Sequence, residues 1–332
     1  MPTVERDARL LRRVQGDNLT YTTDRMAASD TSATLAKSTG AERCRSGVVG
    51  FQPSEFLGCD DGAVELITAV ANLVRDQGLD VGVPVNLRST NNVVAWMCPS
   101  PVVAKIARDF DASVRELQLA TFLAAVGAPV VPPIEIGIAQ PVNVEGQWVT
   151  FWHHVADERT ATPTQVAVSL DVLHAGLAKV PGQSKFPPCW GRLETALDLL
   201  DNPDLPGGLT EDDRALLRRA LLEGIATLAS LSDPPHVLHG SPHRFNILVM
   251  YGEAVFIDFE TVELGPLEWD LAHLEGEVAG LYPADLDEDL LRHSRIAISA
   301  ATSTWCWEGI DRGADMRSHA EDHLETVRRA LV

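Results

Sequence analysis

The sequence predicts a bilobal α+β protein in which a small sheet-plus-helix N-terminal lobe precedes a larger, mainly helical C-terminal lobe. Between residues 83 and 155, short β-branched runs surround one helical stretch, and after residue 155 helical periodicity dominates. The 332 residues have the length of about two domains or lobes. We therefore expect lobes at 51–155 and 156–332. Residues 1–50 are rich in Thr, Ser, Asp and Arg without such periodicity, and they predict a mobile extension.

The first lobe should contain two helices and a small sheet. Over residues 62–78 the apolar side chains recur at helical spacing and predict an amphipathic helix. The stretch "VPVNLRSTNNVVAWMCPSPVVAKIA" at 83–107 has two β-branched runs separated by turn formers, which predict strands. A helix is expected at 113–127 and a further strand in "QWVTFWHHV" at 147–155. The end of this strand, 152–155, should form the hinge to the second lobe.

The second lobe should consist mainly of helices. Helical periodicity predicts five of them, at 163–177, 192–200, 211–231, 284–299 and 314–330. Three short strands, "HVLH", "NILVM" and "AVFID", interrupt this pattern. The last two should pair as a hairpin through a turn at 251–253.

Charge and cysteine content argue against several classes of protein. Asp and Glu number 47 against 27 Lys and Arg, and the formal charge of −20 opposes binding to nucleic acid or to an anionic membrane. The same charge favours a cationic small substrate. The five cysteines are widely scattered, so we expect reduced thiols and a cytoplasmic location. Glycine and prolines interrupt the longest uncharged stretch, so we expect no membrane span. No feature indicates an oligomeric state.

Lysine is scarce in this chain, and Lys105 lies at the centre of the apolar run "VVAKIA". A lysine in a half-buried strand must reach water or meet an anion. Its side chain is therefore either outward-facing or a phosphate ligand that Glu116 of the following helix holds in place. Glu116 has an alternative role, because Ser113-x-x-Glu116 also has the form of an N-terminal capping box.

The loop "RSTNNVVAW" before this strand lacks the glycines of a phosphate-binding loop. Its backbone amides and the side chains of Ser89, Thr90 and Asn91 could still donate to phosphate oxygens, and a solvated hairpin turn is the alternative. No GxxxxGK[ST] pattern occurs, so a Walker-type nucleotide site is excluded.

Two segments that flank the predicted hairpin carry the strongest chemical signal. "HGSPHRFN" at 239–246 leads into it, and "IDFE" at 257–260 follows it. Kinase catalytic loops have the form H-x-D-x-x-x-x-N and are followed by a strand that ends at a metal-binding aspartate. His239, Asn246 and Asp258 match this pattern, whereas Ser241 stands at the position of the loop carboxylate. The pattern indicates phosphoryl transfer from a metal-bound nucleotide at a site without its usual base.

These motifs resemble those of the aminoglycoside phosphotransferase and choline kinase family of small-molecule kinases. The resemblance covers about residues 83–279 and rests on "VVAKIA", "RELQLATFL", "VVPPI", "WVTFWHHV", "LHAGL", "HGSPHRFN", "VFIDFE" and "GPLEWDLAHL". It implies a bilobal protein-kinase-like fold with ATP and Mg²⁺ as cofactors. It also implies transfer of the γ-phosphate to a hydroxyl of a small-molecule acceptor. The acidic composition favours a cationic acceptor, such as an amino sugar or amino alcohol.

The resemblance implies a role for each matching residue. Lys105 would hold the α- and β-phosphates with Glu116 as its partner, and Asn246 and Asp258 would bind magnesium. Asp270, in "EWDLA", would brace the catalytic loop. The hinge residues expected beside adenine are Trp152, His153, His154 and Val155.

The departure at Ser241 leaves the catalytic step open. The family's loop usually reads H-G-D-x-H-x-x-N, in which the first histidine, here His239, is structural and the aspartate accepts or orients the hydroxyl proton. A serine cannot do this at neutral pH without a base of its own, and general-base catalysis contributes on the order of 10²- to 10⁴-fold. Glu260 and His243 are the side chains that could replace the aspartate.

Two other interpretations stay open at this point. Loss of the base is also what a pseudokinase would show, that is, a catalytically weak or inactive nucleotide-binding or interaction protein. In the second interpretation His236, His239 and His243 are transition-metal ligands of a hydrolase, with Asp258 nearby. The motifs also do not distinguish ATP from GTP.

Overall fold

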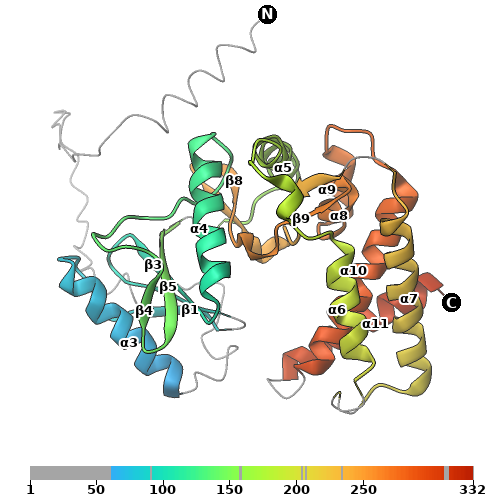
Figure 1. Cartoon of the computed structure of the whole chain (residues 1–332), viewed down its shortest axis with the longest axis horizontal. Helices are drawn as coiled ribbons and strands as arrows, with labels where there is room; N and C mark the ends of the chain where they lie inside the picture. Colours follow the sequence, from blue (N-terminus) through green and yellow to red (C-terminus); the bar gives the residue numbers. More distant parts are fainter. Residues whose placement is uncertain are drawn as a thin grey trace, which may run out of the picture. The chain divides into compact units, whose positions relative to one another are not determined.

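The computed structural model of the chain describes residues 61–89, 92–156, 159–202, 205, 208–232, 235–309 and 314–331. These residues belong to one compact unit, Phe56–Val332. The extension predicted at 1–50 lies outside the described residues, and the lobe boundary predicted at residue 155 stays a prediction. The architecture is α+β, with a small antiparallel sheet in the first part and mainly helices in the second (Figure 1), as the sequence predicts.

The sheet of the first part has five antiparallel strands in the order β1-β2-β3-β5-β4. Their bounds are Val85–Ser89 for β1, Val93–Trp96 for β2, Val102–Ala107 for β3, Val142–Val144 for β4 and Gln147–His153 for β5. The 83–107 stretch thus forms three strands although it shows only two β-branched runs, because β1 has the polar sequence VNLRS. The sequence does not reveal β4, since three residues are too few to show an alternating pattern.

Helices cover both faces of this sheet (Figure 1). α3, Asp61–Asp76, packs its apolar side against the face that contains Ala104 and Phe151. α4, Phe110–Ala125, contacts the sheet on the opposite face, which contains Lys105. Because both faces are covered, β3 is buried along its whole length and has an almost continuous apolar sequence.

The N-terminus of α4 excludes the capping box that the sequence suggests for Ser113 and Glu116. Asp109 is the N-cap, and its side chain accepts a hydrogen bond from the backbone N–H of Ala112 at 3.0 Å. Ser113 already lies in the first turn, where its hydroxyl donates to the carbonyl oxygen of Asp109 at 2.8 Å. The capping box of Ser113 and Glu116 is therefore wrong, and the Glu116 carboxylate has another partner.

The second part is mainly helical, as predicted. Its helices are α5 Pro163–Leu177, α6 Trp190–Leu200, α7 Glu211–Ala229, α8 Leu267–Ala272, α9 Gly276–Leu281, α10 Glu288–Glu308 and α11 Ala314–Leu331. Four of the five predicted helices are confirmed to within two residues. The fifth is predicted at 284–299, but α10 begins after its N-cap Asp287 and continues to Glu308. α8 and α9 have six residues each and are too short to show periodicity. α6, α7, α10 and α11 pack around a common core (Figure 1). Gly224 allows close approach of α7 and α10, because a Cβ there would lie 2.6 Å from that of Ala297.

Two short strand pairs hold the loops that carry the motif residues. The strands are β6 His236–Leu238, β7 Ile247–Met250, β8 Glu253–Phe256 and β9 Glu263–Gly265. β7 and β8 form the predicted hairpin, and β6 pairs with β9, which the sequence does not reveal. Tyr251 and Gly252 make the hairpin turn with φ values of 55° and 87°, the positive values that a type I′ turn requires.

The cysteines of the described residues are in two states. Cys189 and Cys306 are free and buried, as expected for reduced thiols. Cys98 is disulfide-bonded, so the expectation of five reduced thiols is wrong at this position. In the described part of the chain, none of the helices has both the length and the apolar character that a membrane span requires.

Candidate active site

The register of the sheet places two cationic side chains on one face. Arg88 pairs with Val94, Val94 with Lys105, and Lys105 with Thr150. Residues directly opposite one another on neighbouring strands project from the same face of a sheet. Arg88 and Lys105 therefore share a face, with one strand between them.

Lys105 is buried among three carboxylates. Its Nζ lies 2.8 Å from Oε2 of Glu116, 2.8 Å from Oδ1 of Asp258 and 2.7 Å from Oε1 of Glu260. The residue is only 8% exposed, which excludes the outward-facing alternative. Burial alone would lower the pKa of Lys105, but the three carboxylates outweigh this effect and raise it, so the ammonium stays charged.

Asp258 lies directly after the β7–β8 hairpin in an uncommon backbone conformation. Its φ of 70° and ψ of 68° fall in the left-handed region, which residues other than glycine rarely adopt. The next residue, Phe259, donates its backbone N–H to Oε1 of Glu116 at 3.2 Å and so ties this turn to α4. Burial would raise the pKa of Asp258, but Lys105 and Arg88 outweigh it and lower the pKa, so the carboxylate is ionised. Backbone strain of this kind is concentrated at functional sites.

The amide oxygen of Asn246 and the carboxylate of Asp258 both lie near the guanidinium of Arg88. Asn246 is 2% exposed, and its Nδ2 donates to the carbonyl oxygen of Ser241 at 3.0 Å. Its Oδ1 lies 3.5 Å from Nη1 of Arg88, and the same Nη1 lies 4.0 Å from Oδ2 of Asp258. Nη1 of Arg88 therefore lies within 4.0 Å of an oxygen of each residue. Since Mg²⁺ prefers oxygen ligands, these two residues fit the ion that the motif implies.

One group of potential ligands for a cation stands out among the residues that the structure describes. It consists of Glu116, Asp258 and Glu260, whose carboxylate oxygens lie within 4.8 Å of one another. The alternative prediction of a transition-metal site is wrong, because its three histidines do not form a group of ligand atoms this close together in the described part of the chain. They are His236, His239 and His243.

His239 connects the catalytic loop to the strand that precedes Asp258. The residue has no exposed surface, and its Nε2 lies 3.0 Å from the carbonyl oxygen of Ile257. Because a carbonyl only accepts, Nε2 carries the proton, and Nδ1 accepts from the backbone N–H of Ser241 at 3.4 Å. Burial lowers the pKa of His239, in agreement with a neutral ring. His239 therefore ties the 239–246 loop to the carbonyl oxygen of Ile257.

Asp270 is fully buried and braces the same loop. Its Oδ2 accepts the backbone N–H of His239 at 2.9 Å, and its Oδ1 accepts that of Gly240 at 2.8 Å. Nε2 of His174 lies 2.8 Å from Oδ2, and Nδ1 of the same ring lies 2.8 Å from the hydroxyl of Tyr282. The carboxylate only accepts, so Nε2 of His174 donates and Nδ1 accepts from the tyrosine O–H. Burial would raise the pKa of Asp270, but these hydrogen bonds lower it.

The loop also rests on a buried cluster that the sequence does not reveal. Gly240 has a φ of 84°, and a Cβ there would overlap the carbonyl oxygen of Thr261, so only glycine fits. Arg192 of α6 donates to the Gly240 carbonyl oxygen at 2.6 Å and lies 3.6 Å from Oε1 of Glu263. Nε1 of Trp269 donates to the same Oε1 at 2.6 Å. An arginine within a helix carries no local motif, which is why Arg192 is missed.

Glu263 should make the protein less stable as the pH rises. The residue is 1% exposed, and burial raises its pKa to about 8 against the opposing effects of Arg192 and Trp269. An unfolded glutamate loses its proton near pH 4.5, so folded-state stability is lost as the pH rises from about 4.5 to about 8.

Replacement Glu263→Gln should remove this loss. Between about pH 5 and pH 8, the free energy of unfolding of the variant relative to wild type should rise by at least about 1 kcal/mol, measured by urea unfolding. The exposed Glu275→Gln provides a control whose difference from wild type should stay flat. An equally flat difference for Glu263→Gln would show that this carboxyl ionises normally in the folded protein.

Ser241 and the two candidate substitutes for the missing carboxylate lie in different surroundings. Ser241 is 8% exposed. His243 is on the same loop, and its Nε2 lies 3.5 Å from Nδ2 of Asn246. Burial and the charge of Arg88 lower the pKa of His243 to about 4, so its ring is neutral at pH 7. Glu260 instead contacts Lys105, and it accepts a hydrogen bond at 2.6 Å from Asn92, a residue that no sequence motif indicates.

The predicted hinge residues are fixed by contacts with their neighbours. The indole Nε1 of Trp152 donates to the hydroxyl of Thr150 at 2.8 Å. The backbone N–H groups of His153 and His154 donate to carbonyl oxygens of two loop prolines at 3.3 and 2.8 Å. Val155 is half-buried. Because two hinge N–H groups are engaged within the protein, an adenine ring would need other polar groups of this segment.

β1 and β2, the strands on either side of the loop predicted to contact phosphate, pair antiparallel as in a hairpin. The Ser89 hydroxyl accepts from Nδ2 of Asn86 at 2.8 Å and donates to its Oδ1 at 3.2 Å. Thr90 and Asn91 lie outside the described residues. A contact of Ser89 with phosphate stays a prediction.

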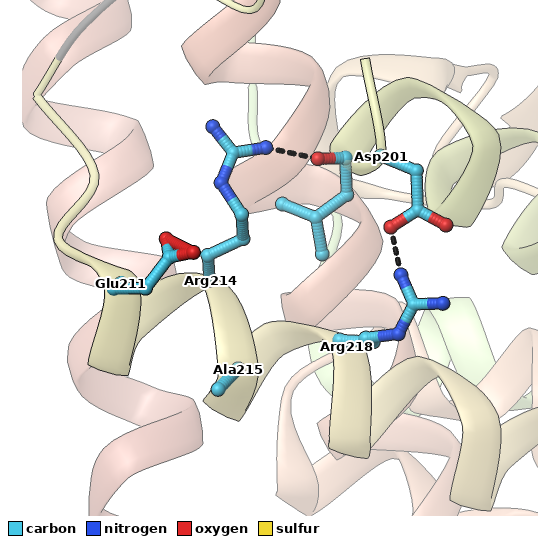
Figure 2. Close-up of a pocket in the computed structure, with 6 residues that line it drawn as sticks. Asp201, Glu211, Arg214, Ala215 and Arg218 are labelled. Carbon is cyan, nitrogen blue, oxygen red and sulfur yellow. Dashed lines mark hydrogen bonds and ion pairs between the residues drawn. The ribbon is translucent and has the colours of Figure 1, made fainter. Parts of the chain in front are cut away.

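A pocket in another part of the molecule does not belong to this site. It lies between the C-terminal end of α6 and the start of α7 (Figure 2) and is lined by Leu200, Asp201, Glu211, Arg214, Ala215 and Arg218. Arg214 donates to the carbonyl oxygen of Leu200, and Arg218 pairs with Asp201, as the dashed lines in Figure 2 show. Both guanidinium groups therefore already have partners, and none of the motif residues lines the pocket.

The fold is shared with small-molecule kinases of known structure. The choline kinase LicA from Streptococcus pneumoniae has a TM-score of 0.60 at 14% identity, over 80% of this chain and 99% of that one. The amicoumacin kinase hAmiN, in complex with AMP-PNP, Ca²⁺ and Ami, has a TM-score of 0.62 at 12% identity. The match covers 82% of this chain and 96% of that one. A spectinomycin phosphotransferase in complex with ADP and spectinomycin has a TM-score of 0.57 at 15% identity. The match covers 80% of this chain and 94% of that one. At these identities the likeness establishes the protein-kinase-like fold.

The sequence itself matches a family model. No curated protein is similar enough in sequence to count as a relative. The model of the phosphotransferase enzyme family matches residues 88–304, about two thirds of the chain. The matched region contains Lys105, the catalytic loop, Asp258 and Asp270. The chain therefore belongs to the phosphotransferase enzyme family.

Proposed function

We propose that the protein is a small-molecule kinase that binds Mg·ATP and transfers the γ-phosphate to a hydroxyl of a small acceptor. The observation that carries this proposal is the convergence of Lys105, Asn246 and Asp258, which come from the sheet, the catalytic loop and the end of the hairpin. Family membership supports the chemistry. Structures of similar fold that contain AMP-PNP or ADP support the use of a nucleotide.

Each of these residues has a distinct task in the proposal. Lys105 binds the α- and β-phosphates, and Glu116 keeps its ammonium in place. Asn246 and Asp258 hold Mg²⁺, which neutralises charge on the phosphates when bound. Phosphoryl transfer depends mainly on positioning and charge neutralisation, so the braced loop and the ion pair of Lys105 supply most of what the reaction needs.

Because position 241 is a serine, we expect phosphoryl transfer to be slow. Its hydroxyl can form a hydrogen bond with an acceptor but cannot take a proton at neutral pH. Of the two substitutes, His243 is better placed, because it lies on the catalytic loop beside Asn246. The Glu260 carboxylate is engaged by Lys105 and Asn92.

Ser241 also favours a second candidate function, that of a nucleotide-binding protein without transfer. In this case the site would bind Mg·ATP without cleaving it, and no phosphate would be transferred to an acceptor. The two candidates share every contact of Lys105, so only turnover distinguishes them.

We further propose a cationic acceptor such as an amino sugar or amino alcohol. The formal charge of −20 supports it, since a strongly acidic protein attracts cations. The choline kinase and the spectinomycin phosphotransferase of similar fold make choline and spectinomycin suitable first acceptors to test.

Replacement Ser241→Asp should raise phosphoryl transfer by about 100-fold, because it supplies a carboxylate where the loop has none. The hydrogen bonds that hold the loop use the backbone of Ser241 and should persist. The measurement is ADP release from Mg·ATP in the presence of choline, ethanolamine, kanamycin or spectinomycin.

The exposed Ser184→Asp provides a control for the added charge and should leave turnover unchanged. Turnover that appears or rises only in Ser241→Asp would support a kinase that lacks its base. Binding of Mg·ATP without turnover in either wild type or Ser241→Asp would contradict the kinase and support the second candidate.

A further inference from the structure

The face on which Arg88 lies is determined by a β-bulge. In the β1–β2 pair the register shifts between Asn86 and Arg88, so that Leu87 is the extra residue. With regular pairing, Leu87 would lie opposite Val94 and Arg88 would project from the face covered by α3. The bulge reverses this, because one extra residue exchanges the two faces of a strand. Leu87 is consequently 48% exposed, and Arg88 shares a face with Lys105.

The guanidinium of Arg88 is near the site but not tightly bound in it. Its contacts with Asn246 and Asp258, at 3.5 and 4.0 Å, are long for charged hydrogen bonds. Lys105, by comparison, contacts its carboxylates at 2.7 to 2.9 Å. The side chain of Arg88 is 35% exposed, so it can move without opening the core.

The position of Arg88 conflicts with a cation at the same two oxygens. Asn246 Oδ1 and Asp258 Oδ2 belong to the two residues to which the proposed function assigns Mg²⁺, and both lie near Nη1 of Arg88. Two cations cannot share these oxygens without strong repulsion. When the metal and its nucleotide bind, the guanidinium must turn to another anion, and the phosphates are the nearest new one.

We propose that Arg88 binds the γ-phosphate of bound ATP, an inference that rests on the proposed function. Lys105 occupies the deeper position beside Glu116 and is assigned to the α- and β-phosphates. Arg88 lies on β1, the edge strand, with β2 between it and Lys105 on β3, and its bidentate guanidinium suits the γ-phosphate. The side chain of Arg88 thus binds the phosphate that backbone amides bind in glycine-rich loops. The hairpin of β1 and β2 lacks such glycines.

The test compares nucleotides that differ by one phosphate. Isothermal titration of wild type and Arg88→Gln with Mg·ADP and Mg·AMP-PNP should show a selective effect. Affinity for AMP-PNP should fall by about 10- to 100-fold, as expected for loss of a charge-assisted hydrogen bond, while affinity for ADP changes by less than about threefold. Arg88→Lys, which keeps the charge, should recover part of the loss.

Arg219→Gln serves as the matched control, because this arginine has a side chain that is 58% exposed on α7 and loses the same charge. Equal weakening of both nucleotides in Arg88→Gln, or weakening of neither, would overturn the assignment of Arg88. Failure of wild type to bind either nucleotide would instead overturn the proposed function itself, so the two failures are distinct.

Discussion

Replacement Asp270→Ala should lower the free energy of unfolding by about 3–5 kcal/mol, because it removes a buried carboxylate from a complete hydrogen-bond network. The substitution leaves the backbone N–H groups of His239 and Gly240 without their acceptor in a fully buried place. Each unsatisfied buried donor costs about 1–3 kcal/mol. His174 loses its partner as well.

The measurement is urea unfolding at neutral pH, with the midpoint compared at a constant m-value. Asp289→Ala is the control, since the side chain of Asp289 is 84% exposed beside Arg292. This substitution should change the free energy of unfolding by less than about 1 kcal/mol. A small and equal effect of both substitutions would show that the catalytic loop does not depend on Asp270.

Replacement Lys105→Ala should weaken binding of Mg·ATP by at least about 100-fold. The substitution removes the cation assigned to the α- and β-phosphates, a contact worth about 1.5–3 kcal/mol or more in a buried site. It also leaves three carboxylates facing one another, of which Glu116 is only 2% exposed. The repulsion among them should further disfavour an anionic nucleotide and lower the stability of the fold.

Titration calorimetry of folded variants, checked by circular dichroism, measures this effect. Lys179→Ala removes the same charge from an exposed position just after α5, and this variant should bind Mg·ATP as wild type does. Unchanged affinity in Lys105→Ala would refute the assignment of the nucleotide site to this face of the sheet.

Local patterns in the sequence are sufficient for much of the fold. The long helices and the β7–β8 hairpin are predicted because their periodicity or turn residues extend over enough positions to be recognised. The catalytic loop is recognised because its polar residues stand at fixed spacing between two strands. Short elements such as β4, β9, α8 and α9 carry no comparable signal and depend on tertiary pairing.

The contacts of the candidate site depend on features that no local pattern contains. Lys105 and Asp258 are separated by 153 positions, and only the folded chain brings them together. The capping box of Glu116 and its ion pair are equally compatible with the sequence, and the position of the N-cap at Asp109 decides between them. The side on which Arg88 projects depends on a single bulge residue, Leu87.

The most direct test of the account is thermal unfolding of wild type and Asp258→Asn with and without Mg·ATP. At 100 times its dissociation constant a ligand adds about 2.7 kcal/mol of stability. We expect a clear upward shift of the unfolding temperature for wild type that requires magnesium, and a much smaller shift for Asp258→Asn. No shift of wild type at millimolar Mg·ATP would contradict a nucleotide site at Lys105, Asn246 and Asp258.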